Sequence, residues 1–326
     1  MSARSAAPGF AAAACAWPRR ALYLPADIKL KTLCNWQGFA SAASATLRGS
    51  LRCDNYIHLR FAARVRWVLT VGAPTTSMPV RESEALILRS FPLGEADRLV
   101  SFLSRSEGRM RGVASGARRT KSRFGSTLEP FSYVRMWFYE RQTRELVRIN
   151  QCELIESFLE AQRDYAVSLA FALVSEVTEA VLGEHEVAEP NFRLLLVIAR
   201  AIKAGAKLPL PLAYFAFWIV RLGGWMPALD RCSRCGADVH NARASMARSG
   251  LFCPNCTLPG QRTISQEALQ LARRMASEKL ERLMKANFAT AAIDDVKDHM
   301  LNLVEQHIEK KLQTRKMTAD EPGQLK

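Results

Sequence analysis

Four cysteines in the C-terminal half have the spacing of a metal site. Cys232 and Cys235 form one C-x2-C pair, Cys253 and Cys256 form a second, and 17 residues separate the pairs. This spacing is typical of zinc held by four thiolates. Four thiolates leave no coordination position for water, so we predict a structural Zn²⁺ site. Disulfides or free thiols are the alternative interpretation. His240 could replace one sulfur, but four cysteines suffice, and we predict a solvated loop histidine.

A second group of residues is basic. Between residues 105 and 123, seven Lys and Arg residues accompany one acid, Glu107, with glycines and small hydroxyl residues between them. Guanidinium groups bind phosphate oxygens bidentately, and small residues let the backbone approach closely. The pattern favours a phosphate-binding loop; a solvated run of charges is the alternative. The candidate DNA-binding residues are Arg109, Arg111, Arg118, Arg119, Lys121 and Arg123, with Arg135 further along the chain.

The aromatic residues around Arg135 have two possible roles. Tyr133 and Trp137 flank this arginine and could form a platform on which nucleic-acid bases stack. Packing into a protein core is the commoner role of such rings, and we predict it for most of the aromatic residues between positions 131 and 139. Tyr133 and Trp137 could serve in either way.

Motifs of common enzyme classes are absent from the sequence. It contains no G-x-x-x-x-G-K-[ST] loop, no G-x-G-x-x-G after a strand, no H-E-x-x-H and no G-x-S-x-G. The H-x-E triplet of a zinc deaminase does not precede Cys253. We therefore predict no catalytic residues and no enzymatic activity. A zinc-dependent nuclease or hydrolase, which would need carboxylate ligands and an open metal position, is a weaker alternative.

The elements that must position these residues change type near residue 160. Before it, five short strands are predicted at residues 85–89, 98–103, 109–115, 131–139 and 145–149, separated by turn signals. Five strands in so short a segment suggest a small barrel. Residues 131–139 are apolar at successive positions, so we expect this strand to be covered on both faces.

After residue 160 the apolar period is helical. Leu169, Leu173, Val177 and Val181 define one helix, residues 191–202 a second, and a third from residue 211 is apolar almost all round, so it should be the buried centre. Further helices are expected at residues 265–276 and 293–312. The predicted fold is therefore α+β: a five-stranded barrel at residues 78–158, a helical domain at 159–315 with a zinc module at 230–259, and a flexible tail at 316–326.

Residues 1–77 differ from the rest of the chain in composition and periodicity. They hold ten basic and two acidic residues and show no sustained period. This composition fits a transit-peptide-like leader or a mistranslated upstream extension, so we predict an unstructured segment and expect Met78 to be the biological start.

Overall composition limits the class of protein. The 326 residues are 48% hydrophobic and 24% charged, which excludes collagen-like, disordered and coiled-coil chains. A formal charge of +15 makes polyanions the first partners to consider. The longest strongly apolar uncharged run, residues 208–220, is too short for a membrane span, so no membrane partner is expected. Paired cysteines in a metal-site pattern indicate a reducing compartment, and we predict a cytoplasmic protein.

Strands, basic loop, helices and paired cysteines in this order resemble the RecO family of bacterial DNA repair proteins. The likeness covers about 235 of the 326 residues, from residue 78 to about 312. The segments that resemble the family are residues 84–89, Ser90-Phe-Pro-Leu-Gly-Glu-Ala-Asp97, the Gly-Ala-Arg-Arg-x-Lys-Ser-Arg-Phe run of residues 116–124, Leu128-Glu-Pro-Phe131, and the paired cysteines after Gly223 and Gly224.

The resemblance implies an oligonucleotide-binding (OB) barrel followed by a helical domain interrupted by a zinc module. It also implies a non-enzymatic recombination mediator of the RecFOR pathway. Such proteins bind single- and double-stranded DNA, anneal complementary strands and, with RecR, help load RecA onto strands coated by single-strand-binding protein. The helical domain receives the acidic C-terminal peptide of that coating protein. By position, Arg118, Arg119, Lys121 and Arg123 match the family's basic segment, and the four cysteines match its zinc knuckle.

Two departures from the family pattern stand out. Residues 1–77 have no counterpart, and some family members lack the cysteines, so zinc cannot be essential to the shared activity. Such a mediator would act in the cytoplasm, associated with the nucleoid. A zinc-ribbon transcription or translation factor, which reads a defined duplex or RNA, is the alternative from another class.

Overall fold

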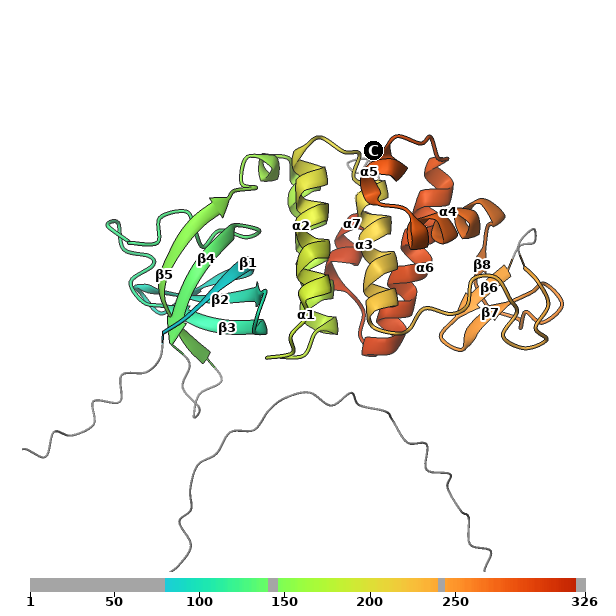
Figure 1. Cartoon of the computed structure of the whole chain (residues 1–326), viewed down its shortest axis with the longest axis horizontal. Helices are drawn as coiled ribbons and strands as arrows, with labels where there is room; N and C mark the ends of the chain where they lie inside the picture. Colours follow the sequence, from blue (N-terminus) through green and yellow to red (C-terminus); the bar gives the residue numbers. More distant parts are fainter. Residues whose placement is uncertain (1–79, 140–145, 240–243, 321–326) are drawn as a thin grey trace, which may run out of the picture. The chain divides into compact units, whose positions relative to one another are not determined.

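The first part of the molecule is a closed barrel of five strands. The computed structural model describes residues 80–139, 146–239 and 244–320. The strands are β1 (Val80–Leu93), β2 (Asp97–Ser104), β3 (Gly108–Ala114), β4 (Tyr133–Tyr139) and β5 (Leu146–Glu156), in the order β1-β2-β3-β5-β4 (Figure 1). Only the β3–β5 pair is parallel. The predicted five-stranded barrel is confirmed, whereas residues 1–77, Met78 and the turn expected at 140–143 lie outside the described residues.

Strand β1 contributes alternate side chains to two separate cores. Ala85 and Ile87 pack inside the barrel, whereas Leu86 and Leu88 pack with the helices that follow. A bulge interrupts the β1–β2 register between Ile87 and Arg89. Other large residues of the barrel interior include Phe102, Met110, Phe124, Leu128, Met136, Phe138 and Ile149. One outer wall of the barrel is therefore buried, which orients the barrel on the helical region.

The coverage of β4 is less complete than the sequence predicts. Its inward residues are buried, and at its start the Tyr133 ring lies 6.0 Å from the Phe192 ring of a helix. Further along the outer face, Arg135 is exposed and Trp137 is half-buried. The expectation of two covered faces is thus wrong beyond the first residues of the strand. The sequence is misleading here because Trp137 is a large apolar residue at a position that the helices do not cover.

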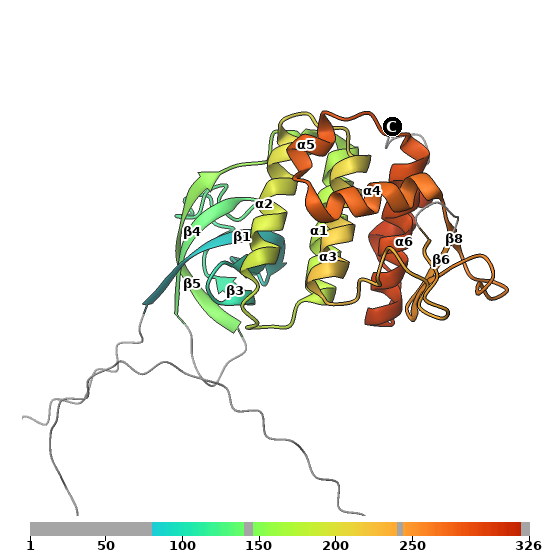
Figure 2. The same cartoon turned by 45° about the vertical axis from the view of Figure 1, so that its right-hand side comes forward.

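Helices form the second part of the molecule. After a short 3₁₀ turn (Ala161–Arg163) come α1 (Tyr165–Val181), α2 (Glu189–Lys203) and α3 (Pro209–Leu222), and later α4 (Gln266–Ser277), α5 (Leu280–Met284), α6 (Thr290–Ile308) and α7 (Gln313–Asp320). Helices α1, α3 and α6 run side by side in both views (Figures 1 and 2). Helix α3 packs against α1, α2, α4, α5 and α6, and Phe215, Phe217 and Val220 on it are fully buried. The prediction that this helix is the buried centre is confirmed.

Helix α7 includes the first residues of the tail predicted at 316–326. Helix α7 continues to Asp320, and residues 321–326 lie outside the described part. Glu176 of α1 accepts hydrogen bonds from the backbone N–H groups of Gln313 and Thr314, at 2.7 and 2.8 Å. Burial would raise the pKa of Glu176, but the hydrogen bonds from Thr314 and Gln313 outweigh it and lower the pKa. A carboxylate from another helix thus caps α7. The residues next to position 313 give no sign of this cap in the sequence.

Strand β3 is joined closely to the segment between α1 and α2. The His185 N–H donates to Arg109 O at 2.9 Å, and Arg109 Nε donates to Leu182 O at 2.8 Å. Gly108 has a φ of 76°, and a Cβ atom at this position would overlap the backbone oxygen of Glu186. Only glycine combines this left-handed backbone with so close an approach. Gly108 is therefore required where the barrel meets the helices.

Replacing Gly108 with alanine is expected to destabilise the protein by at least about 2 kcal/mol. The left-handed backbone costs a non-glycine residue about 1–2 kcal/mol, and the clash with Glu186 adds a similar amount. Thermal unfolding should show a Tm lowered by roughly 4–8 °C. Gly205→Ala is the matched control, because Gly205 has a φ of 83° and a Cβ atom added to it would meet nothing within 4 Å. Equal shifts for the two variants would show that the contact with Glu186 is unimportant.

Candidate metal centre and nucleic-acid interface

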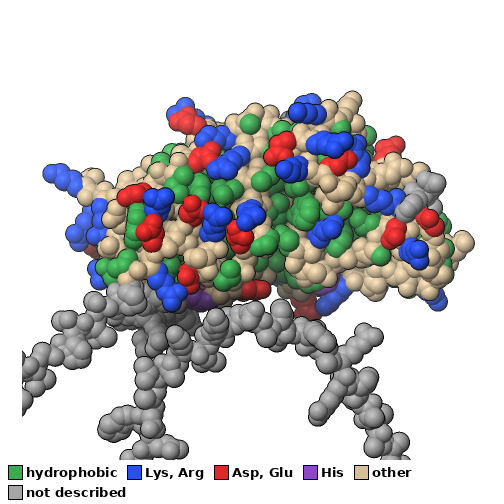
Figure 3. Space-filling view, in the orientation of Figure 1, with side chains coloured by type: hydrophobic (Ala, Val, Ile, Leu, Met, Phe, Trp, Pro, Cys, Tyr) green, Lys and Arg blue, Asp and Glu red, His purple; other side chains and the backbone are tan. Residues whose placement is uncertain are grey.

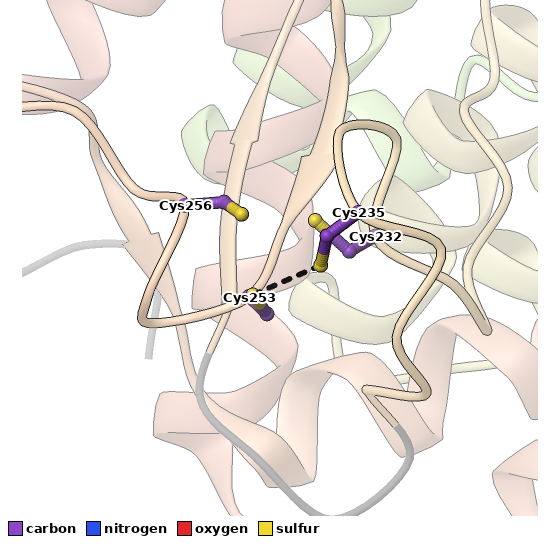
Figure 4. A group of neighbouring side chains, drawn as sticks. All are labelled: Cys232, Cys235, Cys253 and Cys256. Atoms are coloured by element: carbon purple, nitrogen blue, oxygen red, sulfur yellow. Dashed lines mark hydrogen bonds between the residues drawn. The ribbon is translucent and has the colours of Figure 1, made fainter.

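The four cysteine sulfurs converge on one point. The Sγ atoms of Cys232, Cys235, Cys253 and Cys256 all lie within 4.8 Å of one another, and those of Cys235 and Cys253 are 3.7 Å apart (Figure 4). These cysteines are not disulfide-bonded. Zinc–sulfur bonds of about 2.3 Å in a tetrahedral shell place sulfurs about 3.8 Å apart. The cluster therefore has the donor set and the size that one tetrahedral metal ion requires.

Two tight turns aim the sulfurs. In the first pair, the Gly236 N–H donates to Cys232 O at 2.9 Å, and Gly236 has a φ of 71°. In the second pair, the Cys256 N–H donates to Cys253 O at 3.0 Å. Each C-x2-C segment thus folds back on itself, so that its two sulfurs point the same way, and the short spacing in the sequence is the cause.

A small sheet brings the two turns together. Its strands β6 (Ala244–Ala247), β7 (Gly250–Phe252) and β8 (Thr263–Ile264) are ordered β7-β6-β8, and the second cysteine pair follows β7 directly. The Ser233 N–H in the first turn donates to Leu251 O of β7 at 2.8 Å. The metal site is therefore built on a hairpin.

The thiols of the cluster influence one another because they lie so close together. Hydrogen bonds from the backbone N–H groups of Cys253 and Cys235 lower the pKa of the Cys232 thiol to about 6. The pKa of Cys256 is raised to about 12, first because its thiol is hydrogen-bonded to Cys235 and then because it is partly desolvated and close to the Cys232 charge. Four sulfurs this close cannot all ionise without a positive ion between them. A divalent metal would supply that charge.

The cysteine-bearing segment shares the core of the helices. Val239, Met246, Leu251 and Ile264 are buried and belong to the same core as α3 and α6. The side chain of Arg273 in α4 donates from Nε to Leu229 O at 3.0 Å, just before the first cysteine pair. The segment is thus held by apolar packing as well as by its cysteines. The predicted solvated position of His240 lies outside the described residues.

The segment between β3 and β4 carries the exposed cations that the sequence singled out. Arg118, Arg119, Lys121 and Arg123, here called the loop cations, are all exposed. None of the four forms an ion pair with any residue that the structure describes. Figure 3 shows basic side chains gathered at the left end of the barrel, over this segment as placed in Figure 1. The loop therefore presents uncompensated positive charge to solvent.

The other three predicted DNA-binding residues are engaged by protein groups. The Arg109 side chain is only 15% exposed and lies 3.4 Å from Glu184, and Arg111 Nε lies 2.7 Å from the same carboxylate. Arg135 Nε lies 3.5 Å from Glu82. Arg109 and Arg111 thus attach the barrel to the helices, and the charge of Arg135 is partly balanced. The loop cations are the stronger part of the candidate interface.

The candidate stacking residues of β4 differ in access. Tyr133 is 8% exposed and packs on α2, so its ring faces are not available to a base. Trp137 is half-buried, and its Nε1 donates to Glu82 Oε2 at 3.1 Å. Of the two rings, only Trp137 keeps access to solvent.

Sequence reasoning did not find a pocket between α3, α4 and the segment before the first cysteine pair. Its volume is about 470 Å³, and its lining is mostly apolar, with two arginines and one aspartate. The lining residues are Arg221, Gly224, Met226, Pro227, Leu229, Asp230, Arg273 and Ala276. These residues come from two segments, 221–230 and 273–276, that are far apart in the sequence. No local sequence pattern therefore predicts the pocket. Within the described residues, no helix has the length and apolar character that crossing a membrane requires.

Comparison with known proteins agrees with this architecture. The family model for the N-terminal part of recombination protein O matches residues 78–158, and the model for its C-terminal part matches residues 162–316. The chain is 34% identical to a DNA repair protein RecO of Koribacter versatilis over 236 residues, covering 72% of this chain and 96% of that protein. It is 31% identical to a RecO of Syntrophobacter fumaroxidans over 245 residues, covering 74% and 97%. The barrel, the helices and these matches together show that the chain belongs to the RecO family of DNA repair and recombination proteins.

Proposed function

We propose that this protein is a non-enzymatic recombination mediator that binds single- and double-stranded DNA and anneals complementary strands. The observation that carries the proposal is the group of loop cations, which are exposed and without ion-pair partners among the described residues. A DNA backbone would supply the missing negative charge. Membership in a DNA repair family supports DNA as the polyanion.

Annealing by such a surface needs no chemistry on DNA. Two complementary strands repel each other through their phosphates, and cations that replace condensed counterions reduce this repulsion. Contacts to phosphates leave the base edges free to pair. The proposed role of the loop is therefore to hold strands at high local concentration without reading their sequence.

The four-cysteine cluster is proposed to hold a structural Zn²⁺ ion. Cys232, Cys235, Cys253 and Cys256 would fill its tetrahedral shell, and the ion would stabilise the fold of the segment that bears them. A shell of four sulfurs has no position for a reacting water, which supports a mediator over a zinc-dependent hydrolase. The proposal places the protein with its DNA in the cytoplasm, associated with the nucleoid.

The proposed protein partners are RecR, the C-terminal peptide of single-strand-binding protein and, indirectly, RecA. For the acidic peptide, we propose the pocket lined by Arg221 and Arg273. Its apolar lining suits hydrophobic side chains, and the exposed Arg221 suits a carboxylate, whereas Arg273 already donates to the backbone oxygen of Leu229. In this mechanism the pocket binds the single-strand-binding protein that coats one strand, and the barrel binds DNA. RecR then helps to load RecA onto the strand.

Arg221→Glu is expected to weaken binding of a synthetic acidic C-terminal peptide by at least about 10-fold. A charge-assisted hydrogen bond contributes about 1.5–3 kcal/mol, and the new carboxylate would repel the peptide. Fluorescence anisotropy of the labelled peptide measures the change. Arg163→Glu is the control, because Arg163 is 79% exposed and does not line the pocket. Equal affinities of the two variants would remove Arg221 from the peptide site.

The annealing rate of complementary oligonucleotides tests the proposed function. The rate is compared for naked strands and for strands coated with single-strand-binding protein, with and without the purified full chain. Acceleration in both cases is expected. No acceleration with either substrate would contradict the proposal, and competition by RNA but not by random single-stranded DNA would favour a zinc-ribbon transcription or translation factor.

A further inference from the structure

The end of strand β1 presents an aromatic ring to solvent. Strand β4 pairs with β1 only as far as Leu86, so the last residues of β1 pair with β2 alone. In this part, Phe91 is 48% exposed and Leu93 is 40% exposed. Within the described chain, Phe91 belongs to neither hydrophobic core. A single exposed apolar residue is ordinary, so its surroundings must decide whether it has a role.

Phe91 lies in a row of side chains on the outer surface of the barrel that ends at a cation. By register, Phe91 pairs with Leu99, Leu99 with Val113, and Val113 with Arg148. Directly paired residues of neighbouring strands lie on the same face of a sheet, so these four side chains form one row. Leu99 and Val113 are half-buried, and Arg148 is exposed. The ring thus lies at one end of a short apolar strip whose other end is positive.

The loop that carries the loop cations is bound to the same hairpin. The Arg118 N–H donates to Ala96 O at 2.9 Å, and Arg118 Nη1 donates to Gly94 O at 2.7 Å. The Gly116 N–H donates to Asp97 Oδ1 at 2.8 Å. Residues 94–96 form the turn between β1 and β2, and Gly94 is three positions after Phe91. These bonds therefore hold the start of the cationic loop on the hairpin that carries the ring.

We propose that Phe91 stacks against unpaired bases of a single strand whose phosphates contact the loop cations. A positive groove beside an exposed aromatic ring is how proteins hold single-stranded nucleic acid without sequence preference. A duplex keeps its bases stacked inside, so it would gain from the cations and not from the ring. The inference rests on the proposed DNA binding and adds a preference for single strands to it.

The test compares wild type and Phe91→Ala, as full-length chains, on three probes. These are an oligothymidylate, an abasic oligomer with the same number of phosphates, and a blunt duplex. Stacking contributes about 1–3 kcal/mol per base, so Phe91→Ala should weaken oligothymidylate binding about 5- to 150-fold. Binding of the abasic oligomer and of the duplex should stay within about twofold, because no phosphate contact is lost. Phe91→Trp should retain oligothymidylate binding.

Tyr165→Ala is the matched control, because Tyr165 is an aromatic residue with 49% exposure at the start of α1. It should bind all three probes like wild type. An unchanged oligothymidylate affinity of Phe91→Ala would overturn the stacking role and leave the proposed DNA binding intact. Equal losses of Phe91→Ala on all three probes would also overturn it, because stacking predicts a loss on the oligothymidylate alone. Failure of the wild type to bind any probe would overturn the proposed function itself.

Discussion

Removing the proposed Zn²⁺ ion from the four-cysteine cluster is expected to unfold the cysteine-bearing segment and to destabilise the helices with it. Structural zinc contributes on the order of 10 kcal/mol to folding, which is comparable to the whole stability of a typical domain. Met246 and Leu251 of this segment are buried in the same core as Phe217 of α3, so the loss cannot stay local. A chelator under reducing conditions, or Cys256→Ser, should lower the Tm strongly and expose the backbone amides of residues 230–239 and 244–264 to hydrogen exchange.

The control for this prediction is a cysteine outside the cluster. Cys152 is buried in the barrel core, and burial raises the pKa of its thiol to about 12, so it is not a candidate ligand. Cys152→Ala should keep one zinc ion per chain, as measured by elemental analysis, whereas Cys256→Ser should lose it. Loss of zinc with no change in Tm or exchange would show that apolar packing alone maintains this segment.

Replacing Arg119, Lys121 and Arg123 together with alanine is expected to reduce the affinity for single-stranded DNA sharply. Each lost phosphate contact removes about 0.7 from the slope of log affinity against log salt, so the slope should become flatter by about 2 units. The same relation predicts a loss of about 30-fold at 0.2 M salt and several hundred-fold at about 0.05 M. Arg118 is left unchanged because its side chain also holds Gly94, so the loop keeps its anchor. Titrations at several salt concentrations measure both quantities.

A triple variant elsewhere on the surface separates a local effect from net charge. Arg163, Arg193 and Arg282 are 79%, 66% and 80% exposed, and their joint replacement with alanine removes the same total charge. This variant should keep nearly the wild-type slope. If both triple variants lowered the slope equally, the DNA would be attracted by the overall charge of the protein and not by the loop.

The sequence predicts features whose causes are local. The two C-x2-C turns lie within four residues each, so their spacing alone predicts that Cys232 and Cys235, or Cys253 and Cys256, face one ion. The barrel strands and the buried helix α3 follow from apolar periodicity, which is also local. The family resemblance follows from short segments such as the basic run of residues 116–124 and is supported by the family models.

Features that depend on distant residues could not be predicted in this way. The sequence places Arg109 and Arg111 in one basic run with Arg118, but Glu184, which pairs with the first two, is more than 70 positions away. The same applies to Glu176, which caps α7 across 137 positions of the sequence. A run of like charges therefore indicates where positive residues concentrate, and only the fold indicates which of them remain unpaired.

The division of β1 between two cores makes the register of this strand decisive for the whole molecule. Ala85 and Ile87 face the barrel interior, and Leu86 and Leu88 face the helices. A slip by a single residue would turn each set towards the wrong side. The four apolar residues 85–88 are flanked by Glu84 and Arg89, so a slip in either direction would move a charged side chain into a buried position. The two charged residues that border this apolar run thus help barrel and helices to assemble correctly.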